Sequence, residues 1–212
     1  MKWKNISPES TIQDKVKAMN DYNGTSFGYV KGRCYDDKMA VGGAFLKRGL
    51  GGGFHGVLLD YIEQFKPKNA KKIALVAESV EAAQDLSKAF PWAEISNIVD
   101  YSDKKSGSDY DVDLNIKQNF NEKYDVVLSQ ALLEHVCNPF MAIENFMDLL
   151  NTNGIIVLHT HSPKMVYHPY PIDCLRFHKD WFVDIQKYLP IELLDFLEAD
   201  VHLFCVFRKI GV

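Results

Sequence analysis

The stretch that decides the fold is residues 124–158, which read YDVVLSQALLEHV at 124–136, NPFMAIENFMDLL at 138–150 and NGIIVL at 153–158. The apolar, β-branched run Asp125–Ser129 predicts a buried strand, and the polar residues after it predict a turn. Pro139–Leu150 has the start signal and length of a helix, and Gly154 separates it from a second apolar strand, Ile155–His159. Strand, helix and strand in this order predict two parallel strands joined by a helical crossover.

Strands and helices also alternate on both sides of this unit. The other expected strands are Ile73–Ala77, Ile95–Val99, Asp111–Ile116 and a final hairpin of Ile191–Leu197 and His202–Arg208; the other expected helices are Ser10–Asn20, Phe54–Phe65, Val80–Phe90 and His178–Tyr188. The tight connection makes the final pair antiparallel. The predicted fold class is therefore α/β, a three-layer sandwich around a mostly parallel seven-stranded sheet with an antiparallel C-terminal edge strand.

Composition argues against several classes of function. The net charge of −4 provides no basic footprint for nucleic acid. The longest apolar runs are too short to span a membrane, and the first ten residues lack the apolar core of a signal peptide. Four scattered cysteines without a CxxC pair indicate reduced thiols. These features predict a cytoplasmic protein with neither nucleic acid nor membrane as a partner.

The quoted segments resemble the class I (Rossmann-like) S-adenosylmethionine-dependent methyltransferases, in which a YDVV…LEHV.NP segment and an NGG.IVL strand flank the methyl donor. The resemblance covers roughly residues 70–180. It implies a methyltransferase-like Rossmann domain over residues 67–212, after a helical and glycine-rich extension over residues 1–66. It also implies S-adenosylmethionine as the cofactor and a small-molecule or sugar-like compound as the methyl acceptor.

In a parallel sheet, ligands bind beyond the carboxyl ends of the strands, near the switch in strand order. The residues expected there, and hence around the donor, are Ala77, Glu78, Ser79, Asp100, Tyr101, Asp113, Leu114, Ser129 and Gln130. The resemblance assigns Asp100 to the ribose hydroxyls, the pair at 113–114 to the adenine and the pair at 129–130 to the methionine moiety. Glu134-His135 matches the Glu-His pair of the family, and we interpret it as a structural anchor because buried polar groups need partners.

The chain departs from the family after its first parallel strand. The family has a glycine-rich turn there, whereas this chain has Ala77-Glu78-Ser79, and no glycine occurs between Gly56 and Gly107. The Glu78 carboxylate is expected close to the carboxylate of the donor, which is a repulsive pair. Either the turn binds the donor in a modified way, or the protein is a non-catalytic methyltransferase-fold protein that binds a ligand or partner.

A weaker alternative lies in the segment Gly51–Gly56, which formally fits the dinucleotide pattern G-x-G-x-x-G before a helix. Glu78 follows at about the spacing that a nicotinamide dinucleotide site requires, but the strand that should precede the motif is short and charged. A loop that covers the sheet edge or the pocket explains the same glycines.

Histidines gather at and beyond the last parallel strand. His168 lies in a proline-stiffened loop and is our first candidate for the base that removes the acceptor proton; His161 is the second. The alternative is a packed loop in which Asp173 pairs with Arg176. His159 and His161 share one face of an extended strand, yet their spacing matches no standard zinc pattern, so we expect no metal ion.

Overall fold

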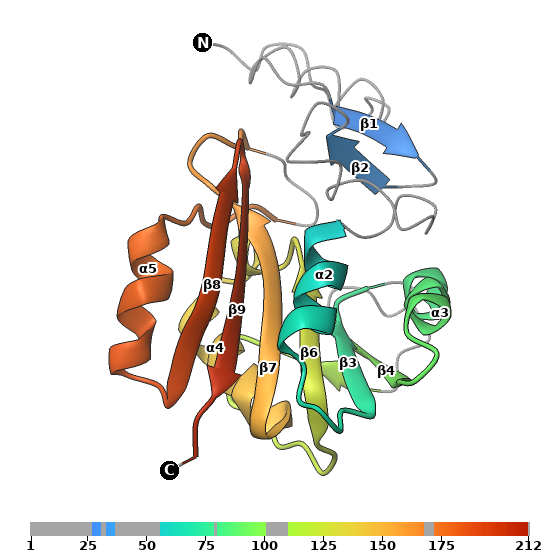
Figure 1. The fold of residues 1–212 in the computed structure, drawn as a ribbon. Coiled ribbons are helices and arrows are strands. Elements are labelled where there is room, and N and C mark those ends of the chain that lie inside the picture. The colour runs from blue at the N-terminus through green and yellow to red at the C-terminus, as the bar shows by residue number, and fades with distance from the viewer. Residues whose placement is uncertain are drawn as a thin grey trace.

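The computed structural model describes residues 27–30, 33–36, 56–78, 80–100, 110–167 and 172–211 (Figure 1). Its main sheet has the strand order β5-β4-β3-β6-β7-β9-β8, and β1 and β2 form a separate antiparallel hairpin. The strands are β1 (Phe27–Val30), β2 (Arg33–Asp36), β3 (Lys72–Val76), β4 (Glu94–Asp100), β5 (Tyr110–Val112), β6 (Tyr124–Gln130), β7 (Leu150–His161), β8 (Ile191–Ala199) and β9 (His202–Lys209).

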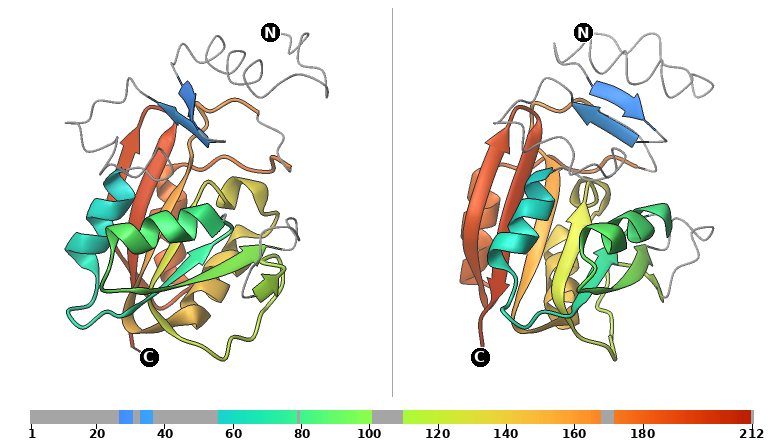
Figure 2. Two further views of the ribbon diagram at one scale, coloured as in Figure 1. Left: turned by 90° about the vertical axis from the view of Figure 1, so that its right-hand side faces the viewer. Right: turned by 45° about the vertical axis from the view of Figure 1, so that its right-hand side comes forward.

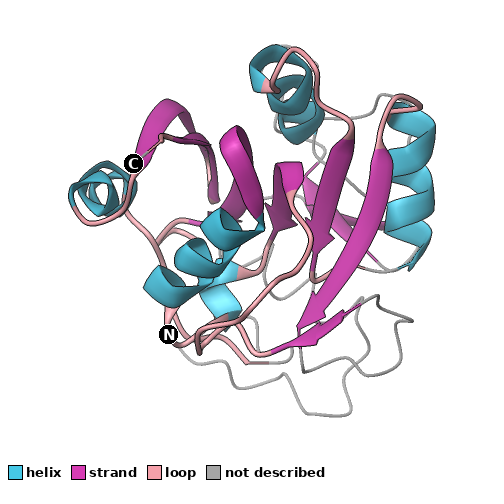
Figure 3. Ribbon diagram, turned by 90° about the horizontal axis from the view of Figure 1, so that it is seen from below, coloured by secondary structure: helices cyan, strands magenta, loops and turns pink. Residues whose placement is uncertain are grey.

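Helices cover both faces of the main sheet, as Figures 2 and 3 show. They are α2 (Gly56–Phe65), α3 (Val80–Ala89), α4 (Pro139–Leu149) and α5 (Lys179–Asp184), with short 3-10 turns η1 (Leu133–His135) and η2 (Ile185–Lys187). Alternate residues of β3 supply two separate cores: Ile73 and Leu75 pack with α2 and α3, whereas Ala74 and Val76 pack with α4 and α5. This alternation follows from the two-residue period of a strand. The predicted α/β class and the three layers are confirmed.

The mostly parallel character of the sheet is also confirmed, because β5, β4, β3, β6 and β7 pair in parallel. The position predicted for the C-terminal strand is wrong. β9 pairs antiparallel with both β7 and β8, so it lies inside the sheet and β8 forms the edge. The physical reason is burial: the first six residues of β9 are buried without interruption, whereas β8 is mostly half-buried or exposed. A strand covered on both faces belongs in the interior of a sheet.

Some element lengths also differ from the predictions. The strand expected over Asp111–Ile116 ends at Val112, because the chain turns at residues 113–116. The helix expected over His178–Tyr188 is divided into α5 and η2. The helix expected near Ser10–Asn20 lies outside the described residues. α2 precedes the predicted domain boundary at residue 67 and packs in the core of the main sheet; the boundary stays a prediction. None of the described helices has the length and apolarity that crossing a membrane requires.

The amino ends of the central strands meet at Asp125 on β6. Its carboxylate accepts hydrogen bonds from the backbone N–H groups of Lys71 and Lys72, at 2.7 and 3.1 Å, and from the Asn151 amide at 3.0 Å. Burial raises the pKa of Asp125, but these hydrogen bonds outweigh it and leave the pKa below its usual value. One carboxylate therefore ties β3 and β7 to the strand between them.

We expect Gly154→Ala to destabilise the protein by about 1–3 kcal/mol, the usual cost of overpacking a tight site. A Cβ at Gly154 would lie 2.9 Å from the Asn151 carbonyl oxygen and 3.1 Å from that of Asp125, so backbone must move. Gly211→Ala is the matched control, because its Cβ would meet its nearest neighbour at 3.5 Å, an ordinary contact. Urea unfolding measures both variants, and equal stabilities would contradict this account of the β6–β7 approach.

Candidate functional site

The parallel register aligns the carboxyl ends of the central strands. Val76 on β3 pairs with Ile98 on β4 and with Ser129 on β6. Asp100 in turn pairs with Val112, immediately before Asp113. The strand ends at which the sequence predicts a ligand therefore lie side by side, at the edge of the sheet formed by the carboxyl ends of its parallel strands. That these residues enclose a methyl donor stays a prediction.

Two alanines at this edge adopt the left-handed conformation that usually requires glycine. Ala77 has φ 57° directly after β3, and Ala131 has φ 50° directly after β6. Both are held by backbone hydrogen bonds to the next strand: Ala77 N–H donates to the Ile98 carbonyl at 2.8 Å, and Ala131 N–H to that of His159 at 2.9 Å. Such a conformation costs a non-glycine residue about 1–2 kcal/mol. The turn after β3 thus has a backbone conformation typical of glycine, although the residue there is alanine.

Glu78 connects three neighbouring strands through polar contacts. The Asn97 amide on β4 donates to the Glu78 backbone carbonyl at 2.8 Å. The Gln130 amide at the end of β6 donates to the Glu78 carboxylate at 3.3 Å. The Glu78 carboxylate therefore lies at the ends of β3 and β6, where the resemblance implies the methionine moiety of a donor.

The other residues predicted to surround the donor are only partly described. The Asp113 carboxylate accepts hydrogen bonds from the backbone N–H and the amide of Asn115, at 2.9 and 3.0 Å, and so closes a turn. Leu114 is fully buried in the core. Ser129 is also buried, at 1% exposure. Ser79, Tyr101 and the side chain of Asp100 lie outside the described part of the chain, so their roles remain predictions.

Glu134 is a fully buried carboxylate that connects three segments. It accepts hydrogen bonds from the Thr160 hydroxyl at 2.6 Å and from His161 Nδ1 at 2.5 Å. Its backbone carbonyl accepts the N–H groups of Cys174 and Leu175, at 2.7 and 3.1 Å. Burial raises the pKa of Glu134, but attraction to His161 and its hydrogen bond, with smaller contributions from neighbouring groups, lower that pKa to about 2. The carboxylate is therefore ionised, and it orients His161.

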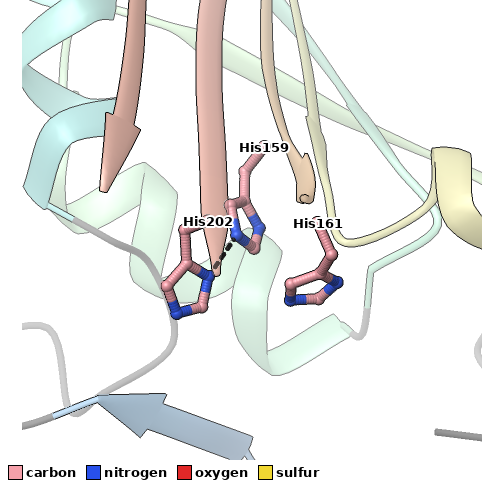
Figure 4. A group of neighbouring side chains, drawn as sticks. All are labelled: His159, His161 and His202. Carbon is pink, nitrogen blue, oxygen red and sulfur yellow. Dashed lines mark hydrogen bonds between the residues drawn. The ribbon is translucent and has the colours of Figure 1, made fainter. Parts of the chain in front are cut away.

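His161 is one of three buried histidines that face one another (Figure 4). His159 and His161 lie on β7, and His202 on β9 pairs directly with His161 in the antiparallel ladder. His159 Nε2 and His202 Nδ1 are 2.8 Å apart. The sequence prediction missed His202 because it assigned the final hairpin to an edge without a register against β7.

The loop before α5 is held by Arg176. Its guanidinium forms an ion pair with Asp173 and donates to the backbone carbonyls of Met165 and Val166, at 3.0 and 2.6 Å. The ion pair expected for a packed loop is therefore present. His168, the first candidate for the base, lies outside the described residues.

Solved structures similar to this chain share its fold. A S-adenosylmethionine-dependent methyltransferase from Clostridium acetobutylicum matches with a TM-score of 0.55 and 7% identity, over 73% of this chain and 89% of that one. A putative methyltransferase from Bacillus halodurans matches with a TM-score of 0.53 and 11% identity, over 73% and 99%. The N-methyltransferase NodS from Bradyrhizobium japonicum matches with a TM-score of 0.51 and 10% identity, over 73% and 93%.

The chain thus has the fold of class I S-adenosylmethionine-dependent methyltransferases. No family model and no curated protein matches its sequence. The [4+2]-cyclase SpnF is equally similar in structure, with a TM-score of 0.53 and 11% identity over 73% of this chain and 81% of that one. The reaction must therefore be argued from the site and not from the fold.

We expect Glu134→Ala to lower the free energy of unfolding by about 2–4 kcal/mol, because Thr160 and His161 then lose a charged acceptor in a buried place. Glu198→Ala is the control. Glu198 pairs with Lys164 at 2.7 Å, but both side chains are largely exposed, and such pairs contribute about 0–1 kcal/mol. Denaturant titration compares the two. A loss at Glu134 no larger than that at Glu198 would show that the buried carboxylate does not hold the site together.

Proposed function

We propose that this protein is a S-adenosylmethionine-dependent methyltransferase that acts on a small-molecule or sugar-like acceptor in the cytoplasm. The observation that carries the proposal is the sheet itself: its order is β5-β4-β3-β6-β7-β9-β8, with β9 antiparallel between β7 and β8. Neighbours named as S-adenosylmethionine-dependent methyltransferases share this fold. Its switch in strand order lies between β3 and β6, which is where ligands bind in such sheets.

At that switch the backbone conformation is compatible with a bound donor, whereas the charge of one side chain repels the donor carboxylate. The left-handed Ala77 lets the chain turn sharply after β3, as the glycine-rich turn of the family does. The Glu78 carboxylate repels the carboxylate of the donor, which the resemblance places closest to it. Asp100 ends β4 next to this turn and is our candidate for the ribose hydroxyls. The fit therefore supports binding of the donor, with reduced affinity.

The bound donor supplies an electrophilic methyl group, and the protein must position an acceptor and remove its proton. His168 is our candidate for the base. Arg176 fixes the backbone carbonyls of Met165 and Val166, which precede His168 in the chain. His161 is the second candidate, because the Glu134 carboxylate accepts a hydrogen bond from its Nδ1 and so orients the ring.

One observation favours a second function. The contact between Glu78 and Gln130 lies across the ends of β3 and β6, where a donor would have to displace or adjust it. A methyltransferase-fold protein that binds a ligand or partner without a donor would retain such a contact. Direct measurement of donor binding separates these two functions.

We expect S-adenosylmethionine and S-adenosylhomocysteine to bind in the micromolar range or more weakly, about −8 kcal/mol or less favourable. Glu78→Gln removes the charge and retains the size of the side chain, and Glu78→Gly also restores the glycine of the family. Both variants should tighten binding by about tenfold or more, since each 1.4 kcal/mol of relieved repulsion is tenfold. Isothermal titration calorimetry measures the change.

Glu81→Gln on the exposed start of α3 is the control for a general change in charge. If neither the wild type nor the Glu78 variants bind the donor or its product, the non-catalytic function replaces the methyltransferase. Nanomolar binding by the wild type would contradict the effect that we assign to the Glu78 charge.

We also expect His168→Ala to lower turnover by about 10²–10⁴, the usual contribution of a general base. Donor affinity should be nearly unchanged, because the base acts on the acceptor. His161→Ala should reduce turnover less. Release of S-adenosylhomocysteine, measured with an acceptor found by screening alcohols, amines and sugars, reports the rates. Full turnover by the His168 variant would contradict its role as the base.

A further inference from the structure

The three histidines at the ends of β7 and β9 form a compact nitrogen cluster. One ring nitrogen of each lies within 4.8 Å of the others. The ring centroids are 5.1 Å apart for His159 and His161, 4.9 Å for His159 and His202, and 5.4 Å for His161 and His202. In Figure 4 the rings converge on a common space from two adjacent strands. Such convergence is the arrangement that a metal ion bound by several imidazoles requires.

The backbone explains why the rings converge. His159 and His161 are two residues apart on β7, so their side chains leave the same face of the sheet. His202 pairs with His161 across the antiparallel ladder, which brings the third side chain to that face. The positions of all three are therefore set by hydrogen-bonded strands, and rigid elements hold ligands more accurately than loops do.

The partner of His161 is the kind that a metal ligand needs. A carboxylate only accepts hydrogen bonds, so Glu134 accepts one from Nδ1 of His161, and Nε2 is the nitrogen through which His161 would bind an ion. Metal-bound histidines almost always donate their second N–H to a carboxylate, carbonyl or water, which fixes the tautomer and makes the ligand more basic. The Thr160 hydroxyl holds the other carboxylate oxygen at 2.6 Å and so fixes Glu134 in turn.

Burial and charge also suit a cation. The exposed fractions of His159, His161 and His202 are 2%, 6% and 2%. Phe204 stacks on His159 with the ring centroids 4.9 Å apart, and this excludes water from one side of the cluster. The Glu134 carboxylate, hydrogen-bonded to His161, offsets part of the charge that an ion would bring into this buried cluster.

We infer that His159, His161 and His202 bind a divalent transition-metal ion, with zinc the best fitted, and that Glu134 positions His161 for it. Imidazole nitrogen suits zinc, copper, nickel and iron, and not the hard ions calcium and magnesium. A tetrahedral zinc with Zn–N distances of about 2.0–2.1 Å places its ligand nitrogens about 3.3 Å apart, so modest ring rotations complete the site.

Three protein ligands leave one position of a tetrahedral ion for water or for an oxygen or nitrogen of a substrate. The assignment does not depend on the proposed function, because the cluster binds the ion whether or not a methyl donor binds. It reverses the sequence expectation of no metal, since β9 supplies the third ligand. A His161 that binds metal through Nε2 is not the base, which leaves His168 as the candidate.

The test is titration of the full chain with metal ions after treatment with EDTA. We expect one Zn²⁺ per chain by calorimetry, and one Co²⁺ whose intense visible absorption indicates tetrahedral geometry and whose near-ultraviolet spectrum lacks thiolate charge-transfer bands. Glu134→Gln keeps all three ligands and should weaken zinc binding by about 10–100-fold, the usual effect of losing such a partner. His159→Gln and His202→Gln should weaken it further.

Two controls locate the ion. His178→Gln changes an exposed histidine outside the cluster and should leave affinity unchanged. A Cys137→Ser, Cys174→Ser double variant removes two exposed thiols, whose sulfurs are 3.5 Å apart, and should also leave affinity unchanged. Circular dichroism shows which variants are folded.

The inference is overturned if the folded wild type binds neither ion, if its Co²⁺ spectrum shows thiolate bands or weak octahedral absorption, or if zinc affinity is the same in the folded histidine variants. Where a histidine variant fails to fold, the wild-type Co²⁺ spectrum and the Glu134→Gln affinity decide the question by themselves.

Discussion

The carboxyl edge of this sheet depends on the buried carboxylate of Glu134. A carboxylate excluded from water is tolerated only with good hydrogen-bond partners. Thr160 and His161 supply them, and because they are successive residues of β7 their side chains leave opposite faces of the strand. The carboxylate reaches both at the end of β7, with one oxygen for each residue. Since the Glu134 carbonyl also holds the chain at Cys174 and Leu175, one residue joins the segment after β6, the end of β7 and the loop before α5.

The rest of the edge follows from the same need to satisfy polar groups where strands end. Ala77 and Ala131 take up a costly backbone conformation because their N–H groups find carbonyls on neighbouring strands. Glu78 is held between β4 and β6 by Asn97 and Gln130. The edge thus presents a fixed carboxylate near the central strands and a nitrogen-rich cluster near β7 and β9. These two features distinguish the chain chemically from the family that it resembles, which has a glycine-rich turn after its first parallel strand.

Much of the fold could be predicted from the sequence because it rests on local periodicity. The strand and helix around Asp125–Ser129 and Pro139–Leu150 are examples, and the structure confirms both. Contacts between distant residues could not be predicted: Glu134 and His161 are 27 residues apart, and His159 and His202 are 43 apart. His159 and His202 meet only because β9 pairs with β7. The nearly unbroken apolar run of β9 could have predicted its place inside the sheet, because a strand with that pattern is covered on both faces. The left-handed conformation of Ala77 and Ala131 could not be predicted, since alanine disfavours that conformation.

The central claim is that the Glu134 carboxylate fixes His161 with its proton on Nδ1 and directs Nε2 toward His159 and His202. Two-dimensional ¹⁵N–¹H NMR of the imidazole rings in the EDTA-treated protein near neutral pH tests this directly, with Glu134→Gln used to assign the His161 signals. We expect a slowly exchanging proton on His161 Nδ1 whose signal shifts when Glu134 is replaced by glutamine. A ring whose Nδ1 carries no proton, or rapid exchange between the two tautomers, would contradict the assignment.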